Sequence, residues 1–225
     1  MAKRIPLGKR EMPIYTKGEE IFNMVSHITG GALGIAALVL CVIRAALHHN
    51  VWGVVSGAIY GATLIVLYAM SSIYHGLSPR LMAKRVFQVL DHCAIFLLIA
   101  GTYTPLSLCS LREYAPWLGW TIFGVIWGMA AFGITLNAID LRRYRVLSMV
   151  SYLGMGWCII LTARLLPSLL GTVGLWFLIA GGLAYTLGAV LYGLAKRRRW
   201  LHSIFHLFVL AGSILHFFCI FFAVL

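Results

Sequence analysis

The sequence contains few charged residues, and acidic residues are the scarcest of them. Only 6 of the 225 residues are Asp or Glu and 18 are Lys or Arg, whereas 61% of the residues are hydrophobic. A water-soluble domain needs a much larger polar surface than these residues supply. Apolar runs also recur along the whole chain, so no soluble domain is left over. The composition therefore predicts an integral membrane protein.

The sequence also lacks any closely spaced pair of cysteines. The five cysteines lie in different apolar segments, and they are Cys41, Cys93, Cys109, Cys158 and Cys219. This spread excludes both a disulfide framework and a cysteine metal site. We expect the five to be buried thiols.

The N-terminus lacks the features of a cleaved signal peptide. The first residues, MAKRIPLGKREMPIYTKGEE, are basic but contain no apolar core followed by a small-residue cleavage site. We therefore expect residues 1–22 to form a cytoplasmic tail and the first membrane span to direct insertion.

Apolar stretches of about 20 residues predict membrane-spanning helices. Seven such stretches occur, at 23–45, 51–74, 87–109, 115–138, 145–166, 170–194 and 201–224. They predict an all-α bundle of seven transmembrane helices over residues 23–225, joined by short loops. Glycine-rich stretches at 30–34 and 182–188 favour close helix packing. Pro105 is expected to bend the third helix.

The basic residues are distributed unequally between the two sides of the predicted bundle. Three of them, Arg44, Arg112 and Arg164, fall on one side. The other fifteen lie in the tail and in alternate loops: Lys3, Arg4, Lys9, Arg10, Lys17, Arg80, Lys84, Arg85, Arg142, Arg143, Arg145, Lys196, Arg197, Arg198 and Arg199. Because Lys and Arg accumulate on the cytoplasmic side, we expect a cytoplasmic N-terminus and an outside C-terminus. This distribution also explains the net charge of +12 better than a nucleic-acid partner does.

Polar residues within the spans gather at one membrane depth. Four helices contribute to this set near the expected cytoplasmic boundary, and its members are Glu19, Glu20, Asn23, His27, Ser71, His75, Asp91, His92, His202 and His206. Ionisable groups inside a membrane are costly and tend to mark functional sites that face the protein interior. We therefore place the candidate site at this depth.

Three histidines of this set could bind a metal ion. His202 and His206 are four residues apart, which puts both imidazoles on one helix face. With His75 they offer three nitrogen ligands for Zn²⁺ and leave a fourth tetrahedral position to water, as in catalytic zinc sites. The alternative is that the two histidines are ordinary hydrogen-bonded residues of the bundle.

Two further residues of the set could take part in catalysis. Ser71 lies four residues before His75 on the same helix face, where its hydroxyl could reach the bound water or a substrate oxygen. Alternatively, the hydroxyl bonds back to the helix carbonyl at i−4. Asp91 would be an expensive unpaired carboxylate unless the zinc-bound water were its partner. The alternative for Asp91 is a salt bridge to Arg85 or Arg80.

The remaining histidines are expected to lie outside the metal shell. His48 and His49 fall in an outer loop and should be solvated. His216 follows His202 by fourteen residues, or about 21 Å along a helix, and should be a core residue. His92 points about 100° away from its neighbour Asp91 around the helix.

His27 is expected to have a different role from the metal ligands. It lies in the first span, close in sequence to Asn23 and Glu20. We expect the three side chains to form a hydrogen-bond network at the cytoplasmic end of this helix.

Four motifs together resemble one protein family across nearly the whole chain. They are E-x3-N-x3-H (Glu19, Asn23, His27), S-x3-H (Ser71, His75), LDHCAIFLLIAGTYTP (Leu90 to Pro105) and H-x3-H (His202, His206). The combination resembles the hemolysin III-like bacterial branch of the progestin and adipoQ receptor family. The resemblance implies seven helices, a cytoplasmic N-terminus and a zinc ion held by three histidines.

The same resemblance implies roles for individual residues. The zinc ligands of the family map onto His75, His202 and His206. Alkaline ceramidases, which are related to the family, look similar in the Ser, Asp and three-His set. By that likeness Asp91 positions or deprotonates the zinc water, and Ser71 helps to stabilise the oxyanion.

Three functions follow as hypotheses. The first is a zinc-dependent hydrolase of membrane lipid amides or esters that contributes to lipid homeostasis, with an acyl lipid as its partner inside the bundle. The second is a non-enzymatic membrane regulator or receptor with structural zinc. The third is a cytolysin. We expect the protein in the bacterial inner membrane as a multi-pass protein without a nucleic-acid partner.

Overall fold

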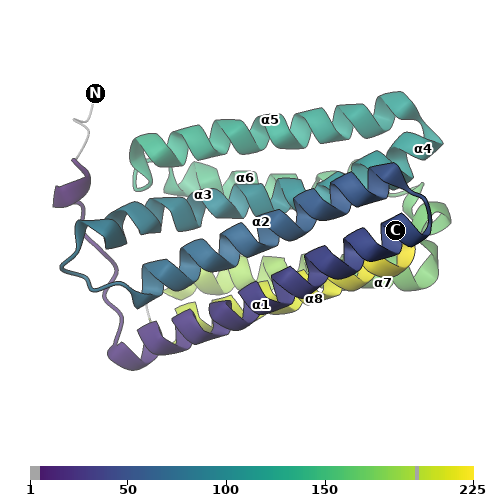
Figure 1. Cartoon of the computed structure of the whole chain (residues 1–225). Helices are drawn as coiled ribbons and strands as arrows, with labels where there is room; N and C mark the ends of the chain where they lie inside the picture. The colour runs from purple at the N-terminus through teal and green to yellow at the C-terminus, as the bar shows by residue number, and fades with distance from the viewer. Residues whose placement is uncertain (1–5, 196–197) are drawn as a thin grey trace.

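The chain forms a bundle of long helices that lie side by side in the computed structural model (Figure 1). The structure describes residues 6–195 and 198–225, so Lys3, Arg4, Lys196 and Arg197 of the predicted charge distribution lie outside it. The described residues contain no β-strand. Seven helical runs are long and apolar enough to cross a membrane. The predicted all-α, seven-helix membrane fold is confirmed.

Four of the seven described runs are single helices, two are composite and one has a kink. The single helices are α1 (Lys17–Leu47), α2 (Val51–Gly76), α5 (Pro116–Asp140) and α8 (Leu201–Ala223). Helix α7 (Leu166–Leu194) is kinked at Gly171, whose φ of 62° and ψ of 178° are not helical. The third run consists of α3 (Met82–Pro105), a π-helical stretch (Leu106–Leu111) and α4 (Arg112–Tyr114). The fifth run consists of α6 (Arg145–Trp157) and a 3-10 stretch (Cys158–Thr162).

Helix α1 starts at Lys17, before the apolar stretch that begins at residue 23. Thr16 and Glu19 form a capping box in which the Glu19 carboxylate accepts a 2.8 Å hydrogen bond from the Thr16 N–H. At about 1.5 Å per residue the 31-residue helix is roughly 46 Å long, which exceeds the hydrocarbon thickness of about 30 Å. The first turns of α1 can therefore carry polar side chains at the end of the bundle.

Glycine allows α1 and α2 to approach each other closely. A Cβ atom on Gly30 would lie 2.5 Å from the Tyr68 ring, and one on Gly61 would lie 2.5 Å from the Leu38 Cα. Small residues at such positions let membrane helices pack tightly without a hydrophobic driving force. The close packing predicted for residues 30–34 is thus confirmed.

The third run changes its hydrogen-bond pattern at Pro105. We expected a bend here, and what the structure shows is a change of helix type to the π-helical stretch Leu106–Leu111. Proline has no N–H to donate within the helix, and π-helical turns accommodate such irregularities.

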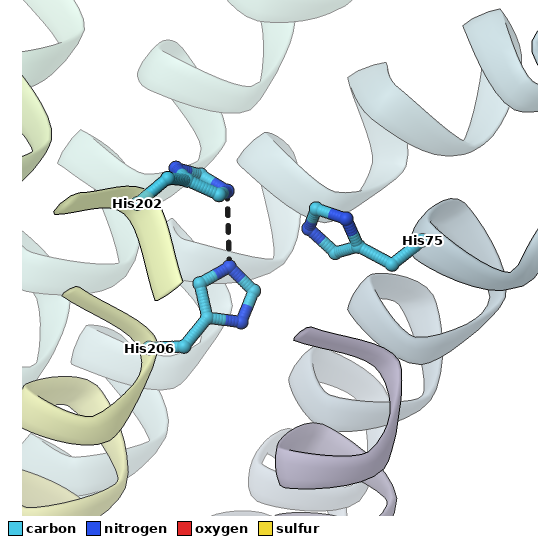
Figure 2. Close-up of side chains that lie close together, drawn as sticks. All are labelled: His75, His202 and His206. Carbon is cyan, nitrogen blue, oxygen red and sulfur yellow. Dashed lines mark hydrogen bonds between the residues drawn. The ribbon is translucent and has the colours of Figure 1, made fainter. Parts of the chain in front are cut away.

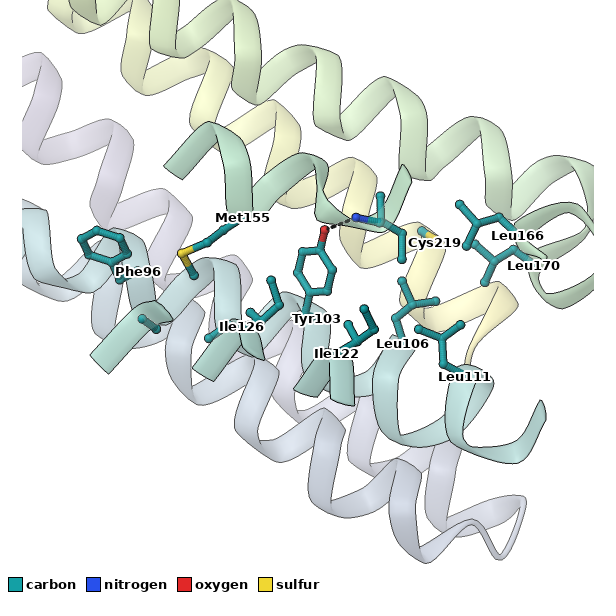
Figure 3. Packing of buried hydrophobic residues seen from close by; sticks show 13 residues of the cluster. Phe96, Tyr103, Leu106, Leu111, Ile122, Ile126, Met155, Leu166, Leu170 and Cys219 are labelled. Atoms are coloured by element: carbon teal, nitrogen blue, oxygen red, sulfur yellow. Dashed lines mark hydrogen bonds between the residues drawn. The ribbon is translucent and has the colours of Figure 1, made fainter. Parts of the chain in front are cut away.

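A buried apolar cluster fills the half of the bundle away from the start of α1 (Figure 3). Tyr103 of α3 lies at its centre, and its hydroxyl accepts a 2.9 Å hydrogen bond from the Ile159 N–H and donates one of 2.9 Å to the Gly156 carbonyl. These bonds pair the backbone carbonyl and N–H groups on either side of the junction between α6 and the 3-10 stretch. The cluster therefore anchors α6 against α3.

Candidate metal centre

Three buried histidines meet at the end of the bundle where α1 begins (Figure 2). His75 lies in the last turn of α2, and His202 and His206 lie in the first turns of α8. The Nε2 atoms of His202 and His206 are 3.0 Å apart. One nitrogen from each of the three rings lies within 4.8 Å of the others. The structure therefore brings together the three predicted ligands.

The geometry of these nitrogens fits a zinc ion. The Nε2 of His75 is buried and has no hydrogen-bond partner among the described residues, so its lone pair is available to a metal. At about 2.0–2.1 Å per Zn–N bond, two ligand nitrogens of a tetrahedral site lie about 3.4 Å apart. The Nε2 atoms of His202 and His206 are already near this separation at 3.0 Å, and the widest pair of the three has to close by up to about 1.4 Å.

The other nitrogen of His75 is held by a carboxylate. Its Nδ1 donates a 2.6 Å hydrogen bond to Oε2 of Glu20, a residue of α1. With the proton on Nδ1, the Nε2 atom of His75 is an acceptor that points away from Glu20. Carboxylates in this position fix the tautomer of metal-ligating histidines and raise their basicity.

Lys84 completes this arrangement, and its position differs from the prediction. We assigned Lys84 to a loop, but it lies in the first turn of α3 and is 1% exposed. Its Nζ donates hydrogen bonds of 2.7 Å to Glu20 Oε1, 3.0 Å to the Tyr74 carbonyl and 3.0 Å to the Leu77 carbonyl. All three ammonium protons are thus satisfied, which is what makes the burial of this charge tolerable.

Glu19 links α1 to the beginning of α8. Its Oε1 accepts a 2.7 Å hydrogen bond from the backbone N–H of Trp200. Trp200 precedes α8 and has φ of 65°, a left-handed conformation in which non-glycine residues are uncommon. Since His202 follows two residues later, Glu19 helps to fix the position of this candidate ligand.

Ser71 has a buried side chain that lacks a hydrogen-bond partner within the described part of the chain. The residue is 1% exposed, and its Oγ is unpaired among the described residues. The alternative of a bond to the carbonyl at i−4 is therefore absent in this part of the chain. The hydroxyl remains free to donate to a ligand in the adjacent cavity.

Asp91 also lies beside this cavity. Its Oδ2 lies 3.7 Å from the Nδ1 of His92, and within residues 6–195 and 198–225 it forms no ion pair with Arg80 or Arg85. The salt-bridge alternative thus fails. His92 donates from Nδ1 to the Gln88 carbonyl at 2.8 Å and stays outside the three-histidine set.

The other predicted polar positions behave differently. His27 stacks on His206, with ring centroids 3.9 Å apart, while Glu20 and Asn23 contact His75 instead. The expected hydrogen-bond network of His27 with these two residues is therefore wrong, because the His27 ring packs against His206. His216 donates to the Leu178 carbonyl at 3.2 Å, as a core histidine would.

A cavity of about 150 Å³ extends from the centre into the bundle between α3, α6, α7 and α8. Ser71, Asp91, His202 and His206 line one end of it. Along α3 the wall continues to Tyr103, twelve residues beyond Asp91, or roughly 18 Å at 1.5 Å per residue. Most of the wall is apolar, so the cavity is an elongated apolar space with the candidate site residues at one end.

Sequence reasoning missed Glu20 and Lys84 as partners of the centre. The motif match used Glu19, which instead caps α1 and contacts Trp200. Helical spacing gave a signal for Glu20, since positions 20, 23 and 27 follow the i, i+3, i+7 pattern of one helix face. Lys84 gave no such signal, because a buried lysine near a helix start cannot be told from a loop lysine by counting charges.

Comparisons with known proteins agree on one family. The family model described as "Haemolysin-III related" matches residues 15–217. The chain is 41% identical to Hemolysin-3 of Bacillus cereus over 92% of each chain, and 37% identical to the Hemolysin-3 homolog of Bacillus subtilis (strain 168) over 93% of this chain and 96% of that protein. It is also 30% identical to the human Monocyte to macrophage differentiation factor, over 98% of this chain and 90% of that protein.

Proposed function

The chain belongs to the haemolysin-III related family, and we propose that this member binds zinc and hydrolyses an amide or ester bond of a membrane lipid. One observation carries the proposal. Two of the three convergent histidines, His202 and His206, line one elongated apolar cavity together with the Asp91 carboxylate and the unpaired Ser71 hydroxyl. Catalytic zinc sites typically have three protein ligands and one open position.

The residues of this chain would hold the metal as follows. His75, His202 and His206 would each supply one nitrogen, and Glu20 would keep the His75 proton on Nδ1. When bound there, Zn²⁺ supplies a Lewis acid that activates water at neutral pH.

Asp91 would transfer the proton of the reaction, and Ser71 would stabilise the negative charge that develops on the substrate. Asp91 is the candidate general base: its carboxylate accepts a proton from the attacking water and returns it to the leaving amine or alcohol. Ser71 is the candidate donor to the carbonyl oxygen of the substrate, where negative charge develops during the attack. Its hydroxyl is unpaired in the described structure, so donating to substrate would break no existing bond.

The cavity suits the apolar part of such a substrate. An acyl chain lying along Ile95, Leu98 and Ile99 of α3 would place its carbonyl carbon near Asp91 and Ser71. Lipid amide and ester bonds lie near the headgroup region of a bilayer, and the centre lies at one end of the bundle. We propose that the substrate enters laterally from the bilayer and binds with its headgroup at this end of the bundle.

The asymmetry of the basic residues supports a cytoplasmic position of the centre. We further propose that the protein resides in the bacterial plasma membrane, as expected for a relative of two Bacillus proteins. Its activity would then contribute to the lipid composition of the inner leaflet.

The test is hydrolysis by the purified protein in lipid nanodiscs. A broad panel of lipid amides and esters is incubated with the zinc-loaded protein, and fatty acid release is measured by mass spectrometry. Release by the wild type but not by His202→Ala supports the proposal. If no lipid of the panel is cleaved, and membrane lipidomes of cells with wild type and His202→Ala are identical, the non-enzymatic regulator replaces the hydrolase. A cytolysin would instead lyse erythrocytes at a rate independent of His202.

A further inference from the structure

The segment before α1 crosses the end of the bundle that carries the metal centre (Figure 1). We call Leu7–Thr16 the strap. It starts with a short 3-10 helix, Leu7–Lys9, beside α3, where a Cβ on Gly8 would lie 2.9 Å from the Met82 Cε. The strap ends at Thr16, which caps α1.

Arg10 fastens the strap to the end of α5. The residue is 9% exposed, and its Nη2 donates a 3.0 Å hydrogen bond to the Ile139 carbonyl and lies 4.0 Å from the Asp140 carboxylate. A second pair, Glu11 with Arg142 at 3.2 Å, is largely exposed. Exposed pairs contribute little, so Arg10 is the main anchor.

Tyr15, near the other end of the strap, covers two of the three metal-site histidines. Its ring stacks on His202 with centroids 4.8 Å apart and an interplanar angle of 25°, and it lies 5.6 Å from His75. The neighbouring side chain of Ile14 is 98% exposed. The Tyr15 ring therefore faces the histidines, whereas the adjacent Ile14 side chain is exposed.

Tyr15 contacts His202 but does not line the cavity. His202 and His206 line the cavity, whereas Tyr15 is not among the lining residues that the structure describes. The Tyr15 ring therefore covers His202 from outside the cavity.

We propose that Tyr15 is a positioning residue that closes the strap side of the metal centre, so that the centre opens only into the apolar cavity. The ring would hold the His202 imidazole in one orientation and keep bulk water and water-soluble chelators from the ligands. This inference rests on the proposed metal site for its chemistry. The covering of His75 and His202 by Tyr15 can be tested without any metal.

The first experiment measures access to the histidines in the full-length, metal-free protein in detergent. Diethylpyrocarbonate modifies accessible imidazoles, and peptide mass spectrometry gives the rate at each histidine. His48 and His49, both exposed, serve as fast internal controls, and His216, which lines the cavity, serves as the control for an intact fold and for entry of the reagent through the cavity. We expect His202 and His75 to react slowly in the wild type and severalfold faster in Tyr15→Ala.

Matched variants distinguish the effect of losing the Tyr15 ring from the effect of a general loosening of the strap. Tyr15→Phe keeps the ring and should react like the wild type, and Ile14→Ala changes only an exposed neighbour and should do the same. Arg10→Ala removes the anchor of the strap. The modification rate of His202 should therefore rise, as in Tyr15→Ala. An unchanged His202 rate in Tyr15→Ala, with His216 still protected, overturns the proposal.

The second experiment measures how fast EDTA removes zinc from the loaded protein. We expect removal from Tyr15→Ala to be roughly 10-fold faster or more, an effect of the size typical for losing a partner of a ligating histidine, with Tyr15→Phe unchanged. Equal rates in Tyr15→Ala and wild type contradict the closure. If the wild type binds no zinc, the proposed function fails, and histidine modification alone then decides whether the strap covers the site.

Discussion

The Glu20 carboxylate and the His75 imidazole share a 2.6 Å hydrogen bond between the first and second helices of the bundle. Glu20 is in turn paired at 2.7 Å with Lys84, whose ammonium also binds two carbonyls at the end of α2. A carboxylate behind a ligating histidine typically contributes 10–100-fold to metal affinity. This chain of contacts therefore couples the packing of three helices to the metal centre.

Replacing Glu20 by Gln should weaken zinc binding while leaving all three ligands in place. The amide has no charge to hold the proton on His75 Nδ1, so we expect the dissociation constant to rise about 10–100-fold. Competition titration with a zinc-chelating dye measures this. Glu11→Gln, an exposed carboxylate on the strap, is the matched control. An affinity equal to that of the wild type would contradict the role assigned to Glu20.

Replacing Lys84 by Met should destabilise the fold. The change leaves the Glu20 carboxylate without its cation, and breaking one side of a buried pair typically costs about 3–5 kcal/mol. Thermal unfolding of the metal-free protein, compared at matched detergent concentration, reports the loss. The double variant Glu20→Gln/Lys84→Met should recover part of it, because no uncompensated charge remains.

The purified protein should contain about one zinc per chain, as expected for one tetrahedral site. His75→Ala, His202→Ala and His206→Ala should each lower the zinc content and the melting temperature together, because metal binding is linked to folding. Elemental analysis and thermal unfolding provide the two readouts. His216→Ala should keep its metal. Full zinc retention in all three ligand variants would sink the assignment.

Asp91→Asn should keep its zinc and lose hydrolytic rate. Removing a general base typically costs on the order of 10²-fold or more, and the amide preserves the shape of the side chain. Ser71→Ala should lose less, since it removes one hydrogen-bond donor and no proton acceptor. Rates are compared on the best lipid of the panel, with zinc content measured in the same samples. Equal rates in wild type and Asp91→Asn would remove the carboxylate from the mechanism.

The seven-helix bundle requires the loop at 196–199 and the C-terminal Leu225 to lie on opposite sides of the membrane. Fusions of a reporter that is active only in the cytoplasm should therefore report activity at the loop and none after Leu225. A reporter that is active only outside should give the reverse pattern. The same result at both positions would contradict the topology.

Gly61→Ala should destabilise the bundle. The added Cβ would lie 2.5 Å from the Leu38 Cα, so α1 and α2 would have to move apart. Overpacking of this kind typically costs about 1–3 kcal/mol. Gly124→Ala is the control: nothing lies within 4 Å of its added Cβ, and alanine has the better helix propensity by roughly 1 kcal/mol. The two melting temperatures should shift in opposite directions.

Several properties of this protein follow from the sequence alone. The scarcity of charge and seven apolar stretches predict the membrane class and the seven helices, because both depend only on composition along the chain. The i, i+4 spacing of His202 and His206 places them on one face of any helix. The same local reasoning places His75 and Asp91 at one membrane depth, since depth follows from position within each span.

Only the tertiary structure decided which groups touch. Glu19 and Glu20 are adjacent in sequence, yet one caps a helix and reaches Trp200 while the other binds His75 and Lys84. That division depends on the rotation of α1 against α2, α3 and α8, which is fixed by packing among residues far apart in the chain. The strap depends on it too, because Tyr15 meets His202 across the end of the finished bundle. Local pattern sets the depth of a side chain in the membrane, and helix packing alone sets its partners.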